Sequence, residues 1–451
     1  MISRRIPIRM LLGLLPVALG IVFVSGCDDA YDVNILYPGR TDFLVEKPPK
    51  VKPTRYDPPG LLPLFSLDGD KDSFGPDQEL LRQEREQNNI HDPRTLDLTV
   101  LQQIALALRD LAGRPRMPKI DLNDNNFEET NKALTRELKL DRKTLAEGSR
   151  IYRTQCLHCH GLVGDGRGPT GPWVNPHPRD FRQGIFKFTS SGQDMGVRKP
   201  RREDLRRTLM NGIEGTSMPS FALLGADQVE ALISYVIHLS IRGETEYSVM
   251  IDLTNEADQK KRNPSRAEET SQPIIQRVRE AADRVGQRWL EAQKAVAQPN
   301  EELAKKFEAM TKEQRLESAA RGYEIFTTKD LSACGGCHVN LGRDAQFSYD
   351  AWGTIIRPRN LTLTQLNLRG GRRPIDLYWR IRTGINGADM PPLINSDADL
   401  TATAPADLKT KHKLGVKEEW IWDLVSFVQM IPYPEVRKEL KAKYGIDIEK
   451  D

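Results

Sequence analysis

The apolar positions of this chain recur mostly at helical spacing, and this pattern predicts a mainly α-helical fold. Residues 96–111 carry such a pattern up to Gly113, and residues 227–239 carry another. A third stripe, in a stretch dense in Lys, Arg, Glu and Gln, comprises Ile274, Ile275, Val278, Ala282, Val285 and Trp289. Its polar opposite face predicts a surface helix that lies on a domain. The stripe spans too few heptads to favour the alternative of a coiled-coil partner.

The N-terminal end is organised differently from the rest of the chain. Three arginines precede an apolar run over residues 10–24, which is typical of a secretory signal. The run closes with Val-Ser-Gly-Cys at Cys27 and resembles the lipobox of bacterial lipoproteins, in which cleavage leaves an acylated cysteine. This resemblance implies a signal peptide over residues 1–26 and a lipid anchor at Cys27. A transmembrane anchor is the alternative, but the run contains Pro16 and is short for a span of roughly 20 residues.

The stretch after the anchor has a composition of its own. Residues 27–75 are rich in Pro and polar residues and predict a stiff tether. Residues 76–140 predict an extension of one or two helices that pack on the next domain or on a partner. The chain carries 66 Lys plus Arg and 63 Asp plus Glu, and cleavage of the signal would remove three arginines. The charges then balance, so composition gives no support to nucleic-acid binding.

Two short strings, residues 156–160 and residues 334–338, have the form C-x-x-C-H. This motif is typical of covalent haem c attachment, in which two thiols form thioethers and the adjacent histidine binds the iron. We therefore predict two haem c groups, attached through Cys156, Cys159, Cys334 and Cys337 and bound at iron by His160 and His338. A zinc site or redox disulfides are the alternatives, because C-x-x-C alone serves both. The histidine directly after each motif favours haem, and no second C-x-x-C lies close enough to complete a zinc ribbon.

An internal repeat points to the second axial ligands. At one offset of 172 residues (376 minus 204), Asp204, Gly212, Gly215 and Met218 match Asp376, Gly384, Gly387 and Met390. Thioether sulfur is a soft ligand for haem iron, so Met218 and Met390 are predicted to bind the two irons. His177 and His238 are the rivals in the first half, and Met430 is the rival in the second. Bis-His ligation would lower the potential relative to His/Met ligation.

In this register the chain resembles class I cytochromes c over residues 141–240 and 316–432. In that family a helix with Gly and an aromatic residue crosses a closing helix of the pattern L-x-x-[YF]-V. The resemblance implies two tandem helical domains, with a charged helical insertion over 241–315 and a charged tail over 433–451. It implies close helix crossings at Gly148 and Gly322. It also implies that the glycine-rich loop over 161–169 folds under the haem, with a carbonyl of Pro169 or Pro178 holding the motif histidine; a plain surface turn is the alternative.

These features together predict an electron carrier. We expect a membrane-tethered dihaem cytochrome on the periplasmic side of a bacterial membrane, between a quinol-oxidising complex and a terminal oxidase or as a subunit of such a complex. The strings GDGRGP and PRDF make the first domain similar to the cytochrome c lipoprotein subunit of alternative complex III. The alternatives are a peroxidase-like dihaem enzyme, which would need a displaceable iron ligand and an acid/base group, and a docking subunit of a respiratory complex.

Overall fold

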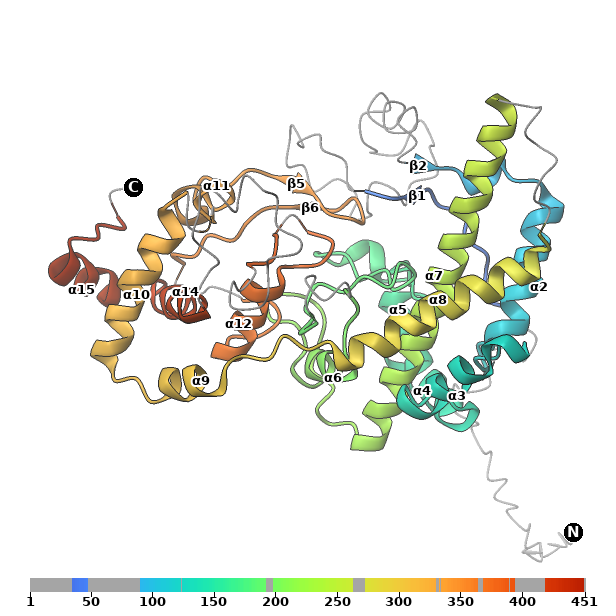
Figure 1. The fold of residues 1–451 in the computed structure, drawn as a ribbon, viewed down its shortest axis with the longest axis horizontal. Helices are drawn as coiled ribbons and strands as arrows, with labels where there is room; N and C mark the ends of the chain where they lie inside the picture. The colour runs from blue at the N-terminus through green and yellow to red at the C-terminus, as the bar shows by residue number, and fades with distance from the viewer. Residues whose placement is uncertain are drawn as a thin grey trace, which may run out of the picture. The chain divides into compact units, whose positions relative to one another are not determined.

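The computed structural model describes residues 35–47, 90–122, 124–191, 198–262, 272–329, 332, 334–363, 368–388, 390–393 and 418–449. Within these ranges the chain is mainly helical, which confirms the predicted fold class (Figure 1). The strands form three two-stranded antiparallel ladders: β1–β2 (Leu44–Val45, Ile90–His91), β3–β4 (Gly113–Arg114, Met117–Pro118) and β5–β6 (Ser348–Tyr349, Ile355–Ile356).

The first domain is built from α4, α5, α6 and α7, which span Arg142–Gln155, Leu157–His160, Arg202–Asn211 and Ala226–Arg262. Asp141 starts α4 by accepting a hydrogen bond from the backbone N–H of Thr144 at 3.0 Å, as an N-cap should. Gly148 lies where α4 crosses α7, and a Cβ there would collide with the carbonyl of Ala231. Glycine therefore permits the close crossing that the family resemblance implies.

The second domain repeats this arrangement with α10, α11, α12 and α14, which span Lys312–Thr327, Cys334–Cys337, Pro374–Thr383 and Glu418–Met430. Thr311 and Gln314 form a capping box at the start of α10. A Cβ on Gly322 would collide with the carbonyl of Asp423 on α14. Both predicted glycine crossings are present.

The segment between the domains is more closely integrated than the sequence predicts. The sequence pattern ends the first domain at residue 240, but α7 continues without a break to Arg262. The predicted amphipathic stripe forms α8 (Ile274–Lys294), which packs on α7, α2 (Leu98–Ala112) and α3 (Glu128–Glu137). Its apolar face is well covered: Val285 and Trp289 are buried in the same core as α4 and α7.

The C-terminal tail also belongs to a core. The sequence predicts a charged tail over residues 433–451, yet α15 (Pro434–Tyr444) buries Val436 and Leu440 against the second domain. α9 (Glu301–Glu308) contributes Phe307 to the same core. Arg437 of the same helix donates to the carbonyl of Thr362 at 3.0 Å, so α15 is attached to the domain by apolar and polar contacts.

Residues 35–47, which the sequence places in the tether, pack on the first domain instead. The Tyr37 hydroxyl lies 3.0 Å from the hydroxyl of Tyr235 on α7. The backbone N–H of Arg40 donates to a carboxylate oxygen of Glu246 at 2.9 Å. β1 then pairs with β2. The tether prediction is therefore wrong for residues 35–47, and residues 48–75 lie outside the described part of the chain, as does Cys27.

A buried ion cluster holds this segment in place. Both terminal guanidinium nitrogens of Arg182 donate to the carboxylate of Asp42 at 3.0 Å, and Arg182 also binds Asp180 at 2.7 Å. Burial alone would raise the pKa of Asp42, but Arg40 and Arg182 hold it well below its ordinary value. Asp42 therefore stays ionised and paired, as buried charges must.

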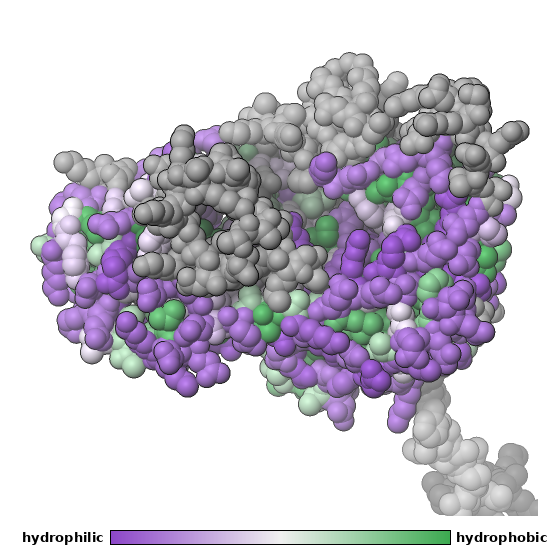
Figure 2. Space-filling model, in the orientation of Figure 1, coloured by the Kyte–Doolittle hydropathy of each residue, from purple (hydrophilic) through white to green (hydrophobic). Residues whose placement is uncertain are grey.

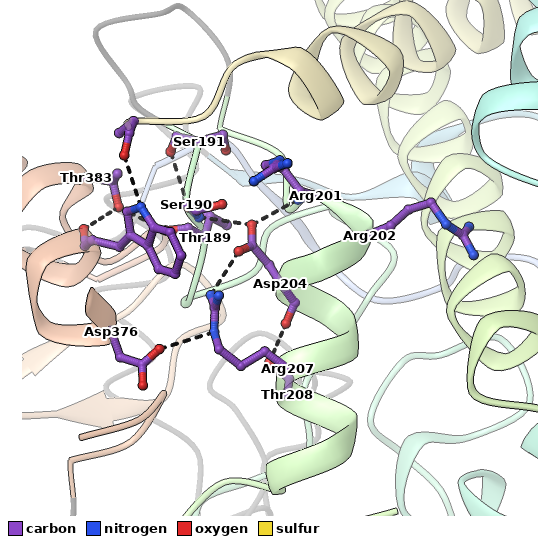
Figure 3. Close-up of polar contacts among 12 residues, drawn as sticks. Thr189, Ser190, Ser191, Arg201, Arg202, Asp204, Arg207, Thr208, Asp376 and Thr383 are labelled. Atoms are coloured by element: carbon purple, nitrogen blue, oxygen red, sulfur yellow. Dashed lines mark hydrogen bonds and ion pairs between the residues drawn. The ribbon is translucent and has the colours of Figure 1, made fainter. Parts of the chain in front are cut away.

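The two domains meet through α6 and α12, which occupy equivalent positions in the two halves of the internal repeat; residues or helices related in this way are called mates below. Arg207 of α6 donates to Asp204 at 2.8 Å and lies 3.5 Å from the carboxylate of Asp376 on α12 (Figure 3). Its guanidinium stands 4.7 Å from the ring centre of Trp379. Arg207 and Trp379 are separated by the repeat offset of 172 residues (379 minus 207). A residue that contacts its own mate indicates a local pseudo-two-fold relation between the helices.

The face drawn in Figure 2 is mostly hydrophilic with scattered apolar residues. Within the described ranges, every helix is too short or too polar to cross a bilayer.

Candidate functional site

The first motif forms one helical turn. α5 brings its residues onto one turn, because the backbone N–H groups of Cys159 and His160 both donate to the carbonyl of Cys156, at 3.1 and 2.9 Å. All four motif cysteines, Cys156, Cys159, Cys334 and Cys337, are free thiols. Burial raises the pKa of Cys156 to about 12, so it is held as a thiol. This is the donor set that thioether attachment of haem c requires.

His160 is held from behind by a backbone carbonyl. Its Nδ1 lies 3.1 Å from the carbonyl oxygen of Arg179. A carbonyl can only accept, so Nδ1 carries the proton and Nε2 keeps its lone pair for a metal. The ring also stacks on Phe181, with centroids 4.6 Å apart. Burial lowers the pKa of His160 to about 4, so the imidazole is neutral at pH 7.

The second motif has the same geometry. α11 carries its cysteines, and the backbone N–H of His338 donates to the carbonyl of Cys334 at 2.9 Å. Nδ1 of His338 lies 3.2 Å from the carbonyl oxygen of Arg359. Gly342, at φ +89°, leaves space for that carbonyl, since a Cβ there would collide with it. Burial lowers the pKa of His338 as well.

The acceptor of the histidine proton differs from the one expected. The family resemblance implies a carbonyl of Pro169 or Pro178, whereas the carbonyls that accept belong to Arg179 and Arg359. These two residues are mates in the strings Pro-Arg-Asp-Phe and Pro-Arg-Asn-Leu. Proline at 178 fixes the backbone before Arg179, and the next carbonyl is the one that reaches the imidazole.

The glycine-rich loop after the first motif packs under that motif and is more than a surface turn. The backbone N–H of Gly166 donates to the carbonyl of His160 at 2.9 Å, and that of Gly168 donates to Cys159 at 3.1 Å. A Cβ on Gly168 would collide with the carbonyl of Leu157. The loop therefore supports the carbonyls of the motif helix.

The two Met-Pro loops share one conformation. The backbone N–H of Ile213 donates to the carbonyl of Met218 at 3.1 Å, and that of Ile385 donates to Met390 at 3.0 Å. Gly212 and Gly384 begin the loops with φ and ψ of 66° and −165°, and of 73° and −166°. Met218 packs against the first core. The repeat in the sequence is thus a repeat in backbone geometry, with each methionine at the same loop position.

The rival histidines lie away from an open ligand position. His238 is buried in α7, and its Nε2 faces the carbonyls of Ala112 and Lys119 at 2.9 and 3.0 Å. Its Nε2 therefore carries a proton and has no lone pair to offer a metal. His177 lies two residues before Arg179, next to Gly166, in the loop that supports the proximal face of His160. Met430 lies partly buried against the second core.

Three parts of the site have no signal in the sequence. These are the docking of residues 35–47 beside Arg182, the stack of Phe181 on His160, and the approach of Trp352 from the second domain to Arg179 of the first. All are contacts between segments far apart in the chain or between loops. Periodicity and spacing report local structure, so they cannot indicate such contacts.

Comparisons with known proteins agree with this geometry for the first domain. Residues 143–236 match the family model described as cytochrome c oxidase, cbb3-type, subunit III. The matched range contains the first motif and Met218. Curated proteins give no match. Among solved structures, a chain of the Kuenenia stuttgartiensis reducing HAO-like protein complex is 21% identical and aligns over 64% of this chain and 96% of its own, with a TM-score of 0.38. The first domain is therefore a cytochrome c domain, which implies a covalently bound haem c.

Proposed function

We propose that this chain is a dihaem c-type cytochrome that carries electrons in a respiratory chain, with one haem c on each motif. The observation that carries the proposal is the equivalence of the two histidines. His160 and His338 each donate Nδ1–H to the carbonyl of a repeat-related arginine, which leaves Nε2 free to bind iron. Haem iron supplies a one-electron ferrous/ferric couple when it is bound there.

Met218 and Met390 are the proposed sixth ligands. Their loops share backbone geometry, and each follows its motif by a similar stretch of chain. His177 lies beside the loop that supports His160, so a sixth ligand would come from another segment of the chain. A His/Met pair raises the reduction potential relative to two histidines.

We further propose a lipid anchor at Cys27 on the periplasmic side of a bacterial membrane. Residues 28–34 would then be the only link between the lipid and the packed segment over 35–47. From Cys27 to residue 35 there are eight peptide units (35 minus 27), which reach at most about 28 Å. This short reach favours a fixed subunit beside a quinol-oxidising complex or terminal oxidase over a carrier that searches widely. Cys27→Ser should release the protein from membranes without changing its haem spectrum; membrane retention would contradict the anchor.

The haem count is tested by mass spectrometry of the denatured protein. Thioether bonds survive denaturation, so the chain should carry the mass of two haems. Cys334→Ala with Cys337→Ala should remove one haem, and Cys156→Ala with Cys159→Ala should remove the other. Haem that is extracted by acid acetone, or zinc in its place, would contradict the proposal.

The ligand assignment is tested by replacing Met390 with His. This change should lower the potential of one haem and leave the other nearly unchanged, and Met218→His should do the converse. Met430→Leu is the matched control and should move neither potential. An unaltered Met-to-ferric-iron absorption band after replacement of both Met218 and Met390 would show that other residues bind the irons.

The carrier role is tested against a peroxidase-like enzyme. If each iron has two protein ligands, the reduced protein should not bind carbon monoxide or turn over peroxide. Electron exchange with a quinol-oxidising complex or a terminal oxidase should be fast instead. Rapid carbon monoxide binding at one haem, together with catalytic oxidation by peroxide, would favour the enzyme.

A further inference from the structure

A pair of polar donors without an acceptor lies where the two domains meet. The guanidinium of Arg179, from the first domain, stands 3.5 Å from the ring centre of Trp352 in the second. Trp352 is 5% exposed, and its indole Nε1–H has no hydrogen-bond partner. Within the described ranges the guanidinium makes neither an ion pair nor a hydrogen bond. Buried donors are normally satisfied, so this pair points to an acceptor supplied from outside the polypeptide.

The other tryptophans show that the combination is specific. Trp289 and Trp422 also lack a partner at Nε1, but Trp289 meets the ring of Phe186 edge-on and Trp422 stacks on Tyr378. The cation near the Trp289 ring, Lys199, is already paired with Glu244 at 2.6 Å. Trp379 does have a guanidinium over its ring, that of Arg207, but its Nε1 donates to the carbonyl of Ala297 at 3.0 Å. Arg207 is itself paired with two carboxylates. Among the described residues, only at Trp352 are both the indole and the guanidinium left without an acceptor.

The surroundings carry an uncompensated positive charge. Asp350 is fully buried, and Lys187 already pairs with it at 2.8 Å. The other nearby carboxylate, Asp180, is taken by Arg182 at 2.7 Å. Arg179 therefore has no carboxylate of its own. One added anion would neutralise the site, which is what a partly buried guanidinium requires.

The position of the pair connects it to both candidate haem sites. The carbonyl of Arg179 accepts the proton of His160. The six-membered ring of Trp352 lies over Gly387, in the loop of Met390, where a Cβ would come within 2.5 Å of the ring. The pair thus lies next to the first motif and against the ligand loop of the second.

We propose that Arg179 and Trp352 form a carboxylate site shared between the domains, which holds a propionate of the haem on the first motif. The inference rests on the proposed function, since it needs a haem at Cys156 and Cys159. Guanidinium and indole N–H groups are suitable donors for a carboxylate, and haem propionates are the carboxylates that must lie within reach of a motif histidine. The second domain would thereby supply a donor to the haem on the first motif, and a cation at this position would favour the ferrous state of that haem.

The test compares Arg179→Gln and Trp352→Phe with Trp379→Phe as the matched control, in the full-length haem protein. In Arg179→Gln the ratio of reduced to oxidised first haem at a fixed electrode potential should fall about tenfold, equivalent to about 59 mV for one electron. Its potential should also become pH-dependent near neutrality, because an unheld propionate protonates more readily. Trp352→Phe should produce a smaller shift in the same direction. Arg179→Lys should recover most of the loss, and Trp379→Phe should change nothing.

A second readout separates a propionate contact from general disturbance of the interface. The resonance Raman bending band of the propionates should shift in Arg179→Gln and Trp352→Phe and not in Trp379→Phe. The titration step moved by Met218→His marks the first haem; shifts confined to the other step would overturn the assignment. Equal behaviour of all three variants with both haems attached would overturn the site itself. If Arg179→Gln does not accumulate, the potentials of the first haem in Trp352→Phe and Arg179→Lys decide whether the site exists. Absence of haem at the first motif by mass spectrometry would contradict the proposed function instead.

Discussion

The two motif histidines make the same hydrogen bond in different surroundings. His160 stacks on Phe181 at 4.6 Å and lies beside Arg179, which Trp352 covers. Within the described part of the chain, the ring in contact with His338 is that of Phe326, which is tilted and has its centroid 5.8 Å away. Arg359, the mate of Arg179, is exposed. Among the described residues, His160 therefore has closer aromatic and cationic neighbours than His338 has.

The cysteines show the same contrast. Cys156 is buried and its equivalent Cys334 is half-buried, and Cys159 is half-buried whereas its equivalent Cys337 is exposed. The first domain is also wrapped by residues 35–47, α2, α3 and α8, which add their apolar residues to its core. If both motifs hold haem, as proposed, the more exposed second motif would be the point of exchange with a partner. The first motif would then be the internal site.

Removing the cysteines of each motif in turn is the strongest test of whether the first motif is more enclosed than the second. Cys156→Ala with Cys159→Ala should destabilise its domain more than Cys334→Ala with Cys337→Ala destabilises the other, because more protein packs around the first motif. The measurement is thermal unfolding followed by circular dichroism, with haem content determined in parallel. Equal losses of stability, or a larger loss from the second pair, would contradict the idea that the first site is the more enclosed.

The helix crossings provide a second test, in which the two domains should behave alike. Gly148→Ala and Gly322→Ala each place a Cβ against a backbone carbonyl of the closing helix. Each should cost about 3 kcal/mol or more in the free energy of unfolding, because a carbonyl in a helix cannot move aside. Gly336→Ala is the matched control, since nothing lies within 4 Å of its added Cβ. Urea unfolding of the three variants measures these losses. A Gly322→Ala variant as stable as the natural protein would mean that α10 and α14 cross less closely than the structure indicates.

Much of this architecture could be predicted from the sequence, and the parts that could not have a common cause. Gly148, Gly322 and the Met-Pro loops repeat at fixed spacing, and such local geometry leaves a pattern. The helix α7 continues past the predicted boundary at residue 240, and the sequence does not indicate this because Arg242 and Glu246 look like solvated charges. They are buried, paired with each other at 3.0 Å, and Glu246 also accepts from the backbone of Arg40. Charge in a sequence reports polarity and not whether a distant segment supplies a partner.

The next test concerns the first domain alone and measures how much the docking of residues 35–47 contributes to its stability. Asp42→Asn removes the charge that pairs with Arg182 and leaves a buried guanidinium short of a partner, which should cost about 3 kcal/mol at pH 7. The pKa of Asp42 is lowered on folding, so its contribution is present above its unfolded pKa of about 3.9 and is lost as pH falls below that value. The stability difference between the natural protein and Asp42→Asn should therefore shrink below that pH, which urea unfolding at several pH values measures. Asp92→Asn is the control, since it affects a more exposed ion pair with Arg94 and asparagine can still accept the hydrogen bond from the backbone N–H of Arg94.

The smallest expected effect distinguishes the closing helices of the two domains. His238 on α7 is buried with Nε2 facing two carbonyls, and burial lowers its pKa to about 4. Since the unfolded chain binds this proton at about pH 6.5, stability should fall as the pH drops from 6.5 towards 4, by about 2 kcal/mol at pH 5. His238→Gln keeps a donor for the carbonyls and should flatten this dependence. The corresponding residue on α14, by alignment of Leu232 with Leu424, is Met430, which does not titrate. Chemical denaturation at pH 5 and pH 7 tests this; an unchanged pH dependence in His238→Gln would assign the acid sensitivity to other groups.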